Sequence, residues 1–520
     1  AWWGPTSFGP QARADAGDDV AAQMLQAGMH HDGMHYFPFV EHGKPSSTHG
    51  LLCINHEYTD DGLLHRDGMQ DWSAEKVKKS KAAHGVSVIE VRHGSTGWQV
   101  VRPSRLARRI TAATPCRISG PARMHPAMTT ATDRRGEFVL GTLNNCAMGV
   151  TPWGTYLTCE ENFNGYFRGP KVPSADQKRY GLSEKSFGFR WDEFDERFDA
   201  TRHPNEINRF GWVVEIDPWN PEQAPVKRTA LGRFKHEGAT VTLARDGRVV
   251  VYMGDDERFE YVYKFVSRDR YRSHSPGNAN LLDEGTLYVA RFEDDGKGRW
   301  LALRHGEKHE NGALTADNGF PSQGEVVIRC RQAADLAGAT KMDRPEWIAV
   351  HPQSGEVYVT LTNNSKRGAP ESAGPNAANP RPENNFGHIV RIRMGHLRAG
   401  RRSAQSGPEQ AGQHQGRCLW QPGWPVVRSR WPAVDPDRRF DECAKQGRLR
   451  QPGQQPDARR RRKKRRHPPL PDRTEGLRTD RHQLDTGWQN AVRQYPAPWR
   501  NGERARRPEQ PHCRFILARQ

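Results

Sequence analysis

Side chains that favour metal ions follow two short apolar segments between residues 141 and 167. The first segment leads into Cys146, and the second, after a Pro-Trp-Gly turn, ends at Glu160 and Glu161. Carboxylates suit hard cations such as calcium, whereas a thiolate suits a softer transition metal. The combination predicts a mixed-metal site. The residues alone are equally compatible with an inert core thiol and a solvated strand end.

Strands that end in acidic or amide side chains recur along the chain, most clearly in residues 51–57, 124–146, 236–256 and 344–364. The additional acidic residues at these strand ends are Glu57, Glu237, Asp255, Asp256 and Glu346. Repeated β-units of about 40–50 residues are typical of a propeller, whose equivalent strand ends surround one central funnel. We therefore expect these side chains to converge. The alternative is that they only occupy solvent-facing turns.

The alternation of apolar and polar residues predicts an all-β fold with almost no amphipathic helix. A hairpin is expected over residues 84–102, and further strands over 211–218, 259–266, 285–292 and 324–330. We interpret residues 1–392 as one β-propeller domain. No apolar run approaches the length of a transmembrane helix.

Other potential ligands give weaker signals. His30, His31, Asp32 and His35 form a histidine-rich run that could bind metal, although exposed loop histidines are the more frequent case. Eight cysteines are present, five of them before residue 393, without CxxC spacing or the density of a disulfide scaffold.

Long stretches of residues 25–392 resemble the PhoX-type alkaline phosphatases. The matching segments include AGMHHDGMHYFP, NHEYT, LNNCAMGVTPWGTYLTCEENFNGYF, FKHEGA, VVVYMGDDERFEYVYKFVS and DRPEWIAVHPQSGEVYVTLTNN. The resemblance implies a β-propeller phosphomonoesterase, six-bladed in the family, with Fe3+ and Ca2+ bridged by an oxo group. It also implies export to the periplasm by the twin-arginine route, although no such signal segment is visible here. We expect a monomer that acts on small phosphate monoesters.

The resemblance also assigns roles to individual residues. Cys146 corresponds to the thiolate ligand of iron, Glu237 and Glu346 to carboxylate ligands of the metal core, and Arg344 to the group that binds phosphate oxygens. The residues expected to complete the calcium shell are Glu161, Glu57, Glu160, Asp255 and Asp256. Metals and an arginine fork supply the positive charge that a phosphate dianion requires, and the bridging oxo or hydroxo group would attack phosphorus in line. No protein nucleophile is needed.

Residues 393–520 differ in character from the rest of the chain. Residues 394–520 hold 29 lysines and arginines, 26 of them arginine, against 12 acidic residues, so nearly all of the net charge of +18 lies there. One interpretation is a disordered nucleic-acid-binding arm, which would bind in a strongly salt-dependent way. However, residues 416–437 and 476–501, back-translated and read one nucleotide later, yield peptides with the strand-turn-strand pattern of a blade. We therefore infer a frameshift near residues 393–397, no nucleic-acid partner and no strands from this tail that are suitable for closing a propeller.

Two further functional classes remain open at this point. One is a propeller that binds calcium or a partner protein without catalysis, which would need no thiolate at Cys146. The other is a propeller esterase or lactonase, whose neutral substrate would need no anion-binding Arg344.

The frameshift leads to a test of activity. A propeller closes by placing its blades in a ring. The chain as written should lack the last blades, so its ring should stay open. We therefore expect it to hydrolyse no p-nitrophenyl phosphate in the presence of calcium. The frame-repaired chain should be active in the same assay. Full activity of the unrepaired chain would contradict the argument, and resequencing the locus would separate an error from a real lesion.

Overall fold

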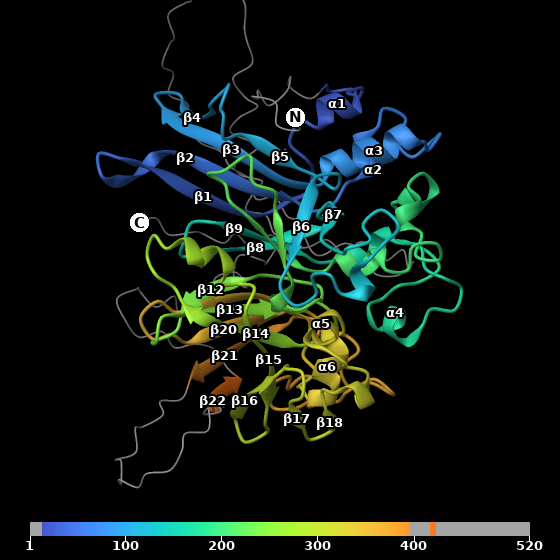
Figure 1. Cartoon of the computed structure of the whole chain (residues 1–520), viewed down its shortest axis with the longest axis vertical. Coiled ribbons are helices and arrows are strands. Elements are labelled where there is room, and N and C mark those ends of the chain that lie inside the picture. The colour runs from blue at the N-terminus through green and yellow to red at the C-terminus, as the bar shows by residue number, and fades with distance from the viewer. Residues whose placement is uncertain (1–12, 395–416, 423–520) are drawn as a thin grey trace, which may run out of the picture. The chain divides into compact units, whose positions relative to one another are not determined.

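Strands form most of the regular structure of the computed structural model, which describes residues 13–394 and the backbone of residues 417–422 (Figure 1). All of these residues belong to the first of two units of the chain, residues 1–434. Apart from residues 393, 394 and 417–422, the predicted out-of-frame tail lies outside the described residues. Its domain boundary and reading frame therefore stay predictions.

The first sheet is built from long alternating segments near the start of the described chain. Its order is β1-β2-β3-β4, and β5 pairs with β3. The strands are β1 (His31–Glu41), β2 (Lys44–His56), β3 (Gly85–Gly94), β4 (Gly97–Val100) and β5 (Arg108–Ile110). The predicted hairpin over residues 84–102 is confirmed by the antiparallel β3–β4 pair. The β1–β2 register places His31 opposite His56, beside Glu57.

The second sheet has the order β7-β6-β11-β10-β9-β8. Its strands are β6 (Pro115–Ser119), β7 (Phe138–Leu140), β8 (Asn145–Val150), β9 (Tyr156–Glu160), β10 (Val213–Ile216) and β11 (Val226–Arg228). Every β9 residue is buried. The hairpin β8–β9 confirms the strand pair predicted around the Pro-Trp-Gly turn.

The third sheet joins nine strands in the order β12-β13-β14-β15-β16-β22-β21-β20-β19. The first five strands are β12 (Thr240–Leu243), β13 (Arg248–Gly254), β14 (Val262–Arg270), β15 (Gly285–Phe292) and β16 (Lys297–Ala302). The other four are β19 (Pro345–Val350), β20 (Val357–Leu361), β21 (His388–Met394) and β22 (Arg417–Pro422). A separate two-stranded ribbon contains β17 (Lys308–His309) and β18 (Gly312–Ala313).

Strand β22 lies in the tail that is expected to supply no strands suitable for closing a propeller. Its backbone pairs with β16 on one side and with β21 on the other. Two facing sheet edges expose unpaired N–H and C=O groups, and an extended segment can satisfy them whatever its sequence, because ladder hydrogen bonds involve only the backbone. The pairing therefore leaves the reading-frame hypothesis untested.

Helices are more frequent than the sequence pattern indicates. The α-helices are α1 (Val20–Gln23), α2 (Asp61–Leu64), α3 (Ala74–Ala83), α4 (Ala175–Arg179), α5 (Gln323–Ile328) and α6 (Cys330–Ala337). The 3-10 turns are η1 (Pro126–Met128), η2 (Phe163–Tyr166), η3 (Trp191–Glu193), η4 (Glu196–Phe198), η5 (Glu206–Arg209), η6 (Thr229–Leu231), η7 (Pro276–Asn280) and η8 (Ala316–Asn318). Within the described part of the chain, no helix combines the length and hydrophobicity needed to cross a bilayer.

The strand predicted over residues 324–330 is wrong, because this segment forms α5 and the start of α6. The Ser322 hydroxyl caps α5 by accepting a hydrogen bond from the Glu325 N–H at 3.2 Å. Val326 then packs into one core cluster, and Val327 and Ile328 into another. A short run that is apolar on all sides gives no periodicity with which to distinguish a buried helix from a buried strand.

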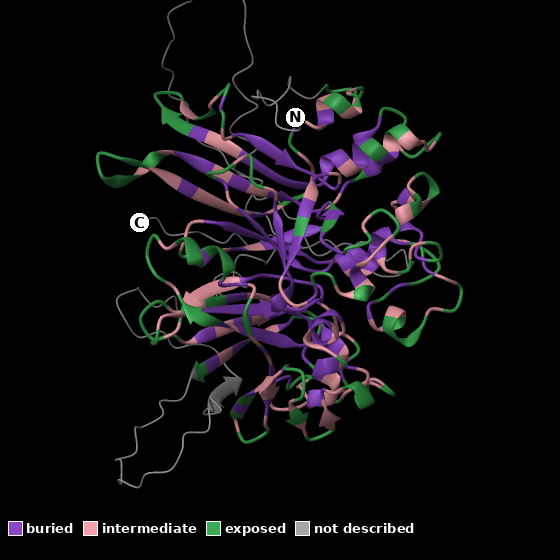
Figure 2. Ribbon diagram, in the orientation of Figure 1, coloured by how far each residue is buried: buried purple, intermediate pink, exposed green. Residues whose placement is uncertain are grey.

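The second sheet contains a buried ion pair among its apolar side chains. Figure 2 shows that buried residues run through the central parts of the sheets, while hairpin ends are exposed. Lys227 of β11 lies 2.8 Å from Glu160 of β9, and both side chains are fully buried. The Lys227 Nζ also donates to the Arg209 carbonyl at 2.8 Å. Each charge thus relies on the other for compensation.

Replacing Lys227 by Met should leave the Glu160 carboxylate buried without its cation. We expect the free energy of unfolding to fall by about 3–5 kcal/mol, measured by urea denaturation. Adding Glu160→Gln to this variant should restore part of the loss. The matched control is Lys297→Met, which removes an exposed partner of Asp295 and should cost about 1 kcal/mol or less. Equal losses in the two single variants would contradict the role assigned to Lys227.

Candidate metal centre

Five acidic or thiol side chains from different parts of the fold meet in one place. Asp32, Glu57 and Cys146 offer ligand atoms that lie within 4.8 Å of one another, and so do Cys146, Glu161 and Glu237. Cys146 belongs to both groups, so the two candidate ion positions share its sulfur. The predicted convergence of Glu57, Cys146, Glu161 and Glu237 is present in the structure.

Cys146 lies at the middle of this cluster. Its Sγ is 2.9 Å from Asp32 Oδ2 and 2.9 Å from Glu237 Oε2, and the thiol can donate to either carboxylate. Burial first, and then the neighbouring carboxylates, raise the pKa of Cys146 well above its ordinary value. Without a cation this sulfur stays protonated. A metal ion would stabilise the thiolate and reverse that preference.

Burial and like charge also act on the glutamates of the cluster. Desolvation raises the pKa of Glu57 and of Glu237 well above the ordinary value, and Coulomb repulsion from Glu161 adds to both shifts. Carboxylates packed together away from water need either protons or cations. Four carboxylates and one thiol therefore form a donor set that fits metal ions of mixed hardness.

Three residues of this region lie at irregularities in β-strand pairing. The register shifts between His31 and Met34 in β1–β2, between Asn145 and Met148 in β8–β9, and between Pro345 and Ile348 in β19–β20. Asp32, Cys146 and Glu346 lie within these intervals. Extra residues in one strand redirect side chains from the regular alternation, which is how bulges contribute to many functional sites. An irregularity of this kind thus occurs in each of the three main sheets.

Arg344 supplies the positive charge predicted for this region. Its Nε and Nη2 donate to the two oxygens of Asp256 at 2.8 and 2.7 Å, and Glu346 Oε1 lies 3.8 Å from Nη2. Burial, followed by repulsion from Asp256, raises the pKa of Glu346 to about 8. Arg344 has a left-handed backbone with φ of 54°. A non-glycine residue rarely adopts this conformation, and such strain is concentrated at functional sites.

Four of the predicted ligands are not part of the five-residue cluster. Asp256 and Glu346 contact Arg344, whereas Glu160 and Asp255 are held by other groups of the protein. Glu160 accepts hydrogen bonds from the N–H groups of Leu143, Gly211 and Trp212, in addition to its ion pair with Lys227. Asp255 is held by Arg331, whose Nε and Nη2 donate to its two oxygens at 2.8 and 2.5 Å. Both carboxylates are fully buried. Their oxygens are therefore occupied by protein donors.

Asp32 is the member of the cluster that the sequence-based ligand set omits. It lies in the histidine-rich run, which forms the start of β1 instead of a loop. The rings nearby contact one another: His30 stacks on Tyr58 at 3.9 Å, and His31 Nδ1 lies 2.9 Å from His56 Nδ1. The available signal was an aspartate at the start of an alternating strand, next to His31, which pairs with His56 across the hairpin.

Comparison with known proteins identifies the family of this chain. The sequence model described as alkaline phosphatase PhoX matches residues 1–413. A solved structure of Pseudomonas fluorescens PhoX in complex with vanadate, a transition state analogue, is similar with a TM-score of 0.71 and 49% sequence identity. The similarity covers 76% of this chain and 69% of that chain. A comparison with curated proteins gave no match.

These matches confirm the predicted all-β propeller fold and the predicted class of enzyme. The chain belongs to the alkaline phosphatase PhoX family, and it is a phosphoric monoester hydrolase by family and fold.

Proposed function

We propose that the chain hydrolyses small phosphate monoesters at the five-residue cluster, with Fe3+ and Ca2+ as its cations. The observation that carries this proposal is the gathering of Asp32, Glu57, Cys146, Glu161 and Glu237 within ligand distance of shared ions. The vanadate complex of the P. fluorescens protein supports the reaction class. A periplasmic or secreted location and a monomeric state belong to the same proposal.

The donor types suggest how the cations divide among the residues. Cys146, Glu237 and Glu346 would hold iron, because a thiolate favours a transition metal over calcium. Hard carboxylate oxygens would complete the calcium positions, and they would come from Asp32, Glu57, Glu161 and Asp256. When bound, the cations supply positive charge at the phosphate and lower the pKa of an attacking water. Glu160 and Asp255 stay outside the proposed ligand set, since each forms a fully buried ion pair with its own cation, Lys227 or Arg331. Asp256 stays in the proposed set although it also accepts from an arginine, because that arginine, Arg344, contacts Glu346 as well.

Arg344 is proposed to bind the phosphate of the substrate. Asp256 holds the guanidinium through both Nε and Nη2, so its orientation is set before substrate arrives. The remaining N–H groups can donate to phosphate oxygens, and they do so more strongly as charge builds up in the transition state. Asp255, which directly precedes Asp256 in the chain, pairs with Arg331.

The two competing functions predict other behaviour at the same residues. A calcium-binding propeller without catalysis has no use for a buried thiol between two carboxylates. A lactonase has no dianion to neutralise, so a fixed arginine beside the cluster would serve no purpose. The alternative of a nucleic-acid-binding tail concerns residues outside the described part of the chain.

Cys146→Ser should separate the enzyme from a binding module. Loss of the sulfur should lower the amount of bound iron and reduce kcat/KM for p-nitrophenyl phosphate by about 100-fold or more. The reason is that Cys146 is proposed to bind the iron directly. The measurements are metal analysis and hydrolysis by the frame-repaired chain. The matched control is Cys116→Ser, since Cys116 is equally buried and its thiol faces the Thr114 carbonyl. Unchanged iron and activity in Cys146→Ser would contradict the proposal.

Arg344→Lys should preserve the charge but remove the planar fork. We expect kcat/KM for p-nitrophenyl phosphate to fall about 10- to 100-fold, with weaker inhibition by inorganic phosphate. Iron content should stay unchanged. The matched control is Arg367→Lys, which alters a fully buried arginine paired with Asp343. That variant should lose stability but keep its KM, so an equal effect of both substitutions on KM would argue against substrate binding by Arg344.

A further inference from the structure

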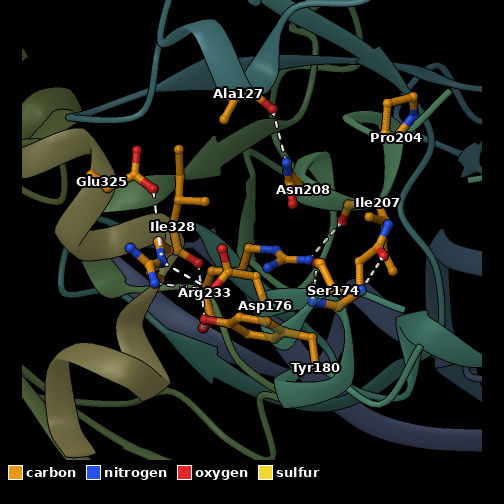
Figure 3. Close-up of a pocket in the computed structure, with 12 residues that line it drawn as sticks. Ala127, Ser174, Asp176, Tyr180, Pro204, Ile207, Asn208, Arg233, Glu325 and Ile328 are labelled. Carbon is orange, nitrogen blue, oxygen red and sulfur yellow. Dashed lines mark hydrogen bonds and ion pairs between the residues drawn. The ribbon is translucent and has the colours of Figure 1, made fainter. Parts of the chain in front are cut away.

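A cavity separate from the five-residue cluster is built around one buried arginine. Its volume is about 200 Å³, and its lining comes from α4 and the residue preceding it, η5, α5 and the segment that precedes Glu237. Figure 3 shows the Arg233 side chain between Tyr180 and Asn208. We call this space the Arg233 cavity. It contains none of the residues of the proposed metal centre.

Arg233 brings a charge into this cavity without a paired carboxylate. Its Nε donates to the Phe210 carbonyl at 3.0 Å and its Nη2 to the Ile207 carbonyl at 3.1 Å. Within the described residues, no carboxylate forms an ion pair with it. Other deeply buried arginines differ: Arg331 pairs with Asp255, and Arg367 with Asp343. Arg109 also donates to neutral groups, but it does not line this cavity.

The surroundings of Arg233 hold the guanidinium in place without neutralising it. Its carbon lies 4.1 Å from the centre of the Tyr180 ring and 5.1 Å from that of Phe163. Burial lowers the pKa of Arg233 to about 10, so the side chain stays charged at neutral pH. Two backbone carbonyls and two rings offset only part of the desolvation of a cation. An anion in the cavity would supply the missing compensation.

Charges at the edge of the cavity restrict the kind of anion. Arg329 is already neutralised by Asp176 at 3.0 Å, and Gln332 donates to the same aspartate oxygen. Glu325 lies 3.4 Å from His125 and 4.0 Å from Arg329. Because the charges of Asp176 and Arg329 offset each other, Glu325 is the carboxylate that adds negative charge at the edge. With this one carboxylate at the edge and one cation inside, a phosphate dianion is disfavoured over a monoanion.

The apolar part of the lining indicates the rest of the ligand. Ile207 and Ile328 are buried side chains of the wall, and Pro204 and Ala127 border the same space. We propose that the Arg233 cavity binds a small organic monocarboxylate, with its carboxylate against Arg233 and its short apolar body against Ile207 and Ile328. This site does not depend on the proposed metal centre.

Titration of the metal-loaded full chain with n-butyrate tests the proposal by calorimetry in phosphate-free buffer. A ligand of this size should bind with a Kd on the order of 1–10 mM. The neutral isostere n-butyramide should bind about tenfold more weakly or not at all, because it leaves Arg233 uncompensated. Inorganic phosphate should not displace butyrate. Absence of butyrate binding, equal binding of the amide, or displacement by phosphate would each overturn the assignment.

Two substitutions locate the binding within the cavity. Arg233→Met should reduce butyrate affinity at least about tenfold by removing the charge. That change also leaves the Phe210 and Ile207 carbonyls without their donor, so a second variant is needed. Ala127→Phe adds volume at the wall of the cavity without removing a hydrogen-bonding side chain. It should abolish butyrate binding. The matched control is Arg304→Lys, which alters an exposed arginine paired with Glu307 outside the cavity and should leave the butyrate Kd within about twofold. Butyrate binding that survives Ala127→Phe would overturn the proposal.

Discussion

Mutual repulsion among buried carboxylates is the constraint around which this structure is arranged. Glu57, Glu161 and Glu237 approach one another and the Cys146 sulfur in an interior where water cannot screen them. Such a cluster is unfavourable for folding unless cations or protons neutralise it. The sheets around it are therefore held together by contacts that do not involve the cluster, among them the Lys227–Glu160 and Arg331–Asp255 pairs.

These outlying ion pairs explain why acidic residues of similar appearance in the sequence have different partners. Glu160 and Glu161 are neighbours, yet β9 directs Glu160 toward Lys227, and Glu161 follows the strand into the cluster. Asp255 and Asp256 divide in the same way between Arg331 and Arg344. Each pair thus combines one carboxylate that fixes the strand end with one that faces the site. Consecutive side chains of an extended backbone point to opposite sides, which produces this division.

The sequence allowed prediction of the strands and of most of the cluster, because both depend on local patterns. Alternation and turn residues indicated the hairpins β3–β4 and β8–β9, and the repeated strand ends indicated convergence. The division within each acidic pair could not be predicted, because it depends on lysines and arginines far away in the chain, such as Lys227 and Arg331. Asp32 appeared in the sequence only as part of a weak histidine-rich signal and was left out of the ligand set, because its position depends on an irregularity in strand pairing. Helix α5 was predicted as a strand because its apolar run has no helical period.

Strand β22 shows what backbone pairing at a sheet edge requires and what it does not. The blade containing β19, β20 and β21 gains its fourth strand from β22, and the same strand also completes the edge at β16. Backbone pairing alone meets the needs of two exposed edges, so almost any extended segment satisfies it. A strand at that position in a catalytic propeller must meet two further requirements. Its end must carry ligands for the central site, and its side chains must be apolar where they face the next blade. The identity of residues 393–520 therefore bears on catalysis more directly than on the pairing of β16 and β21.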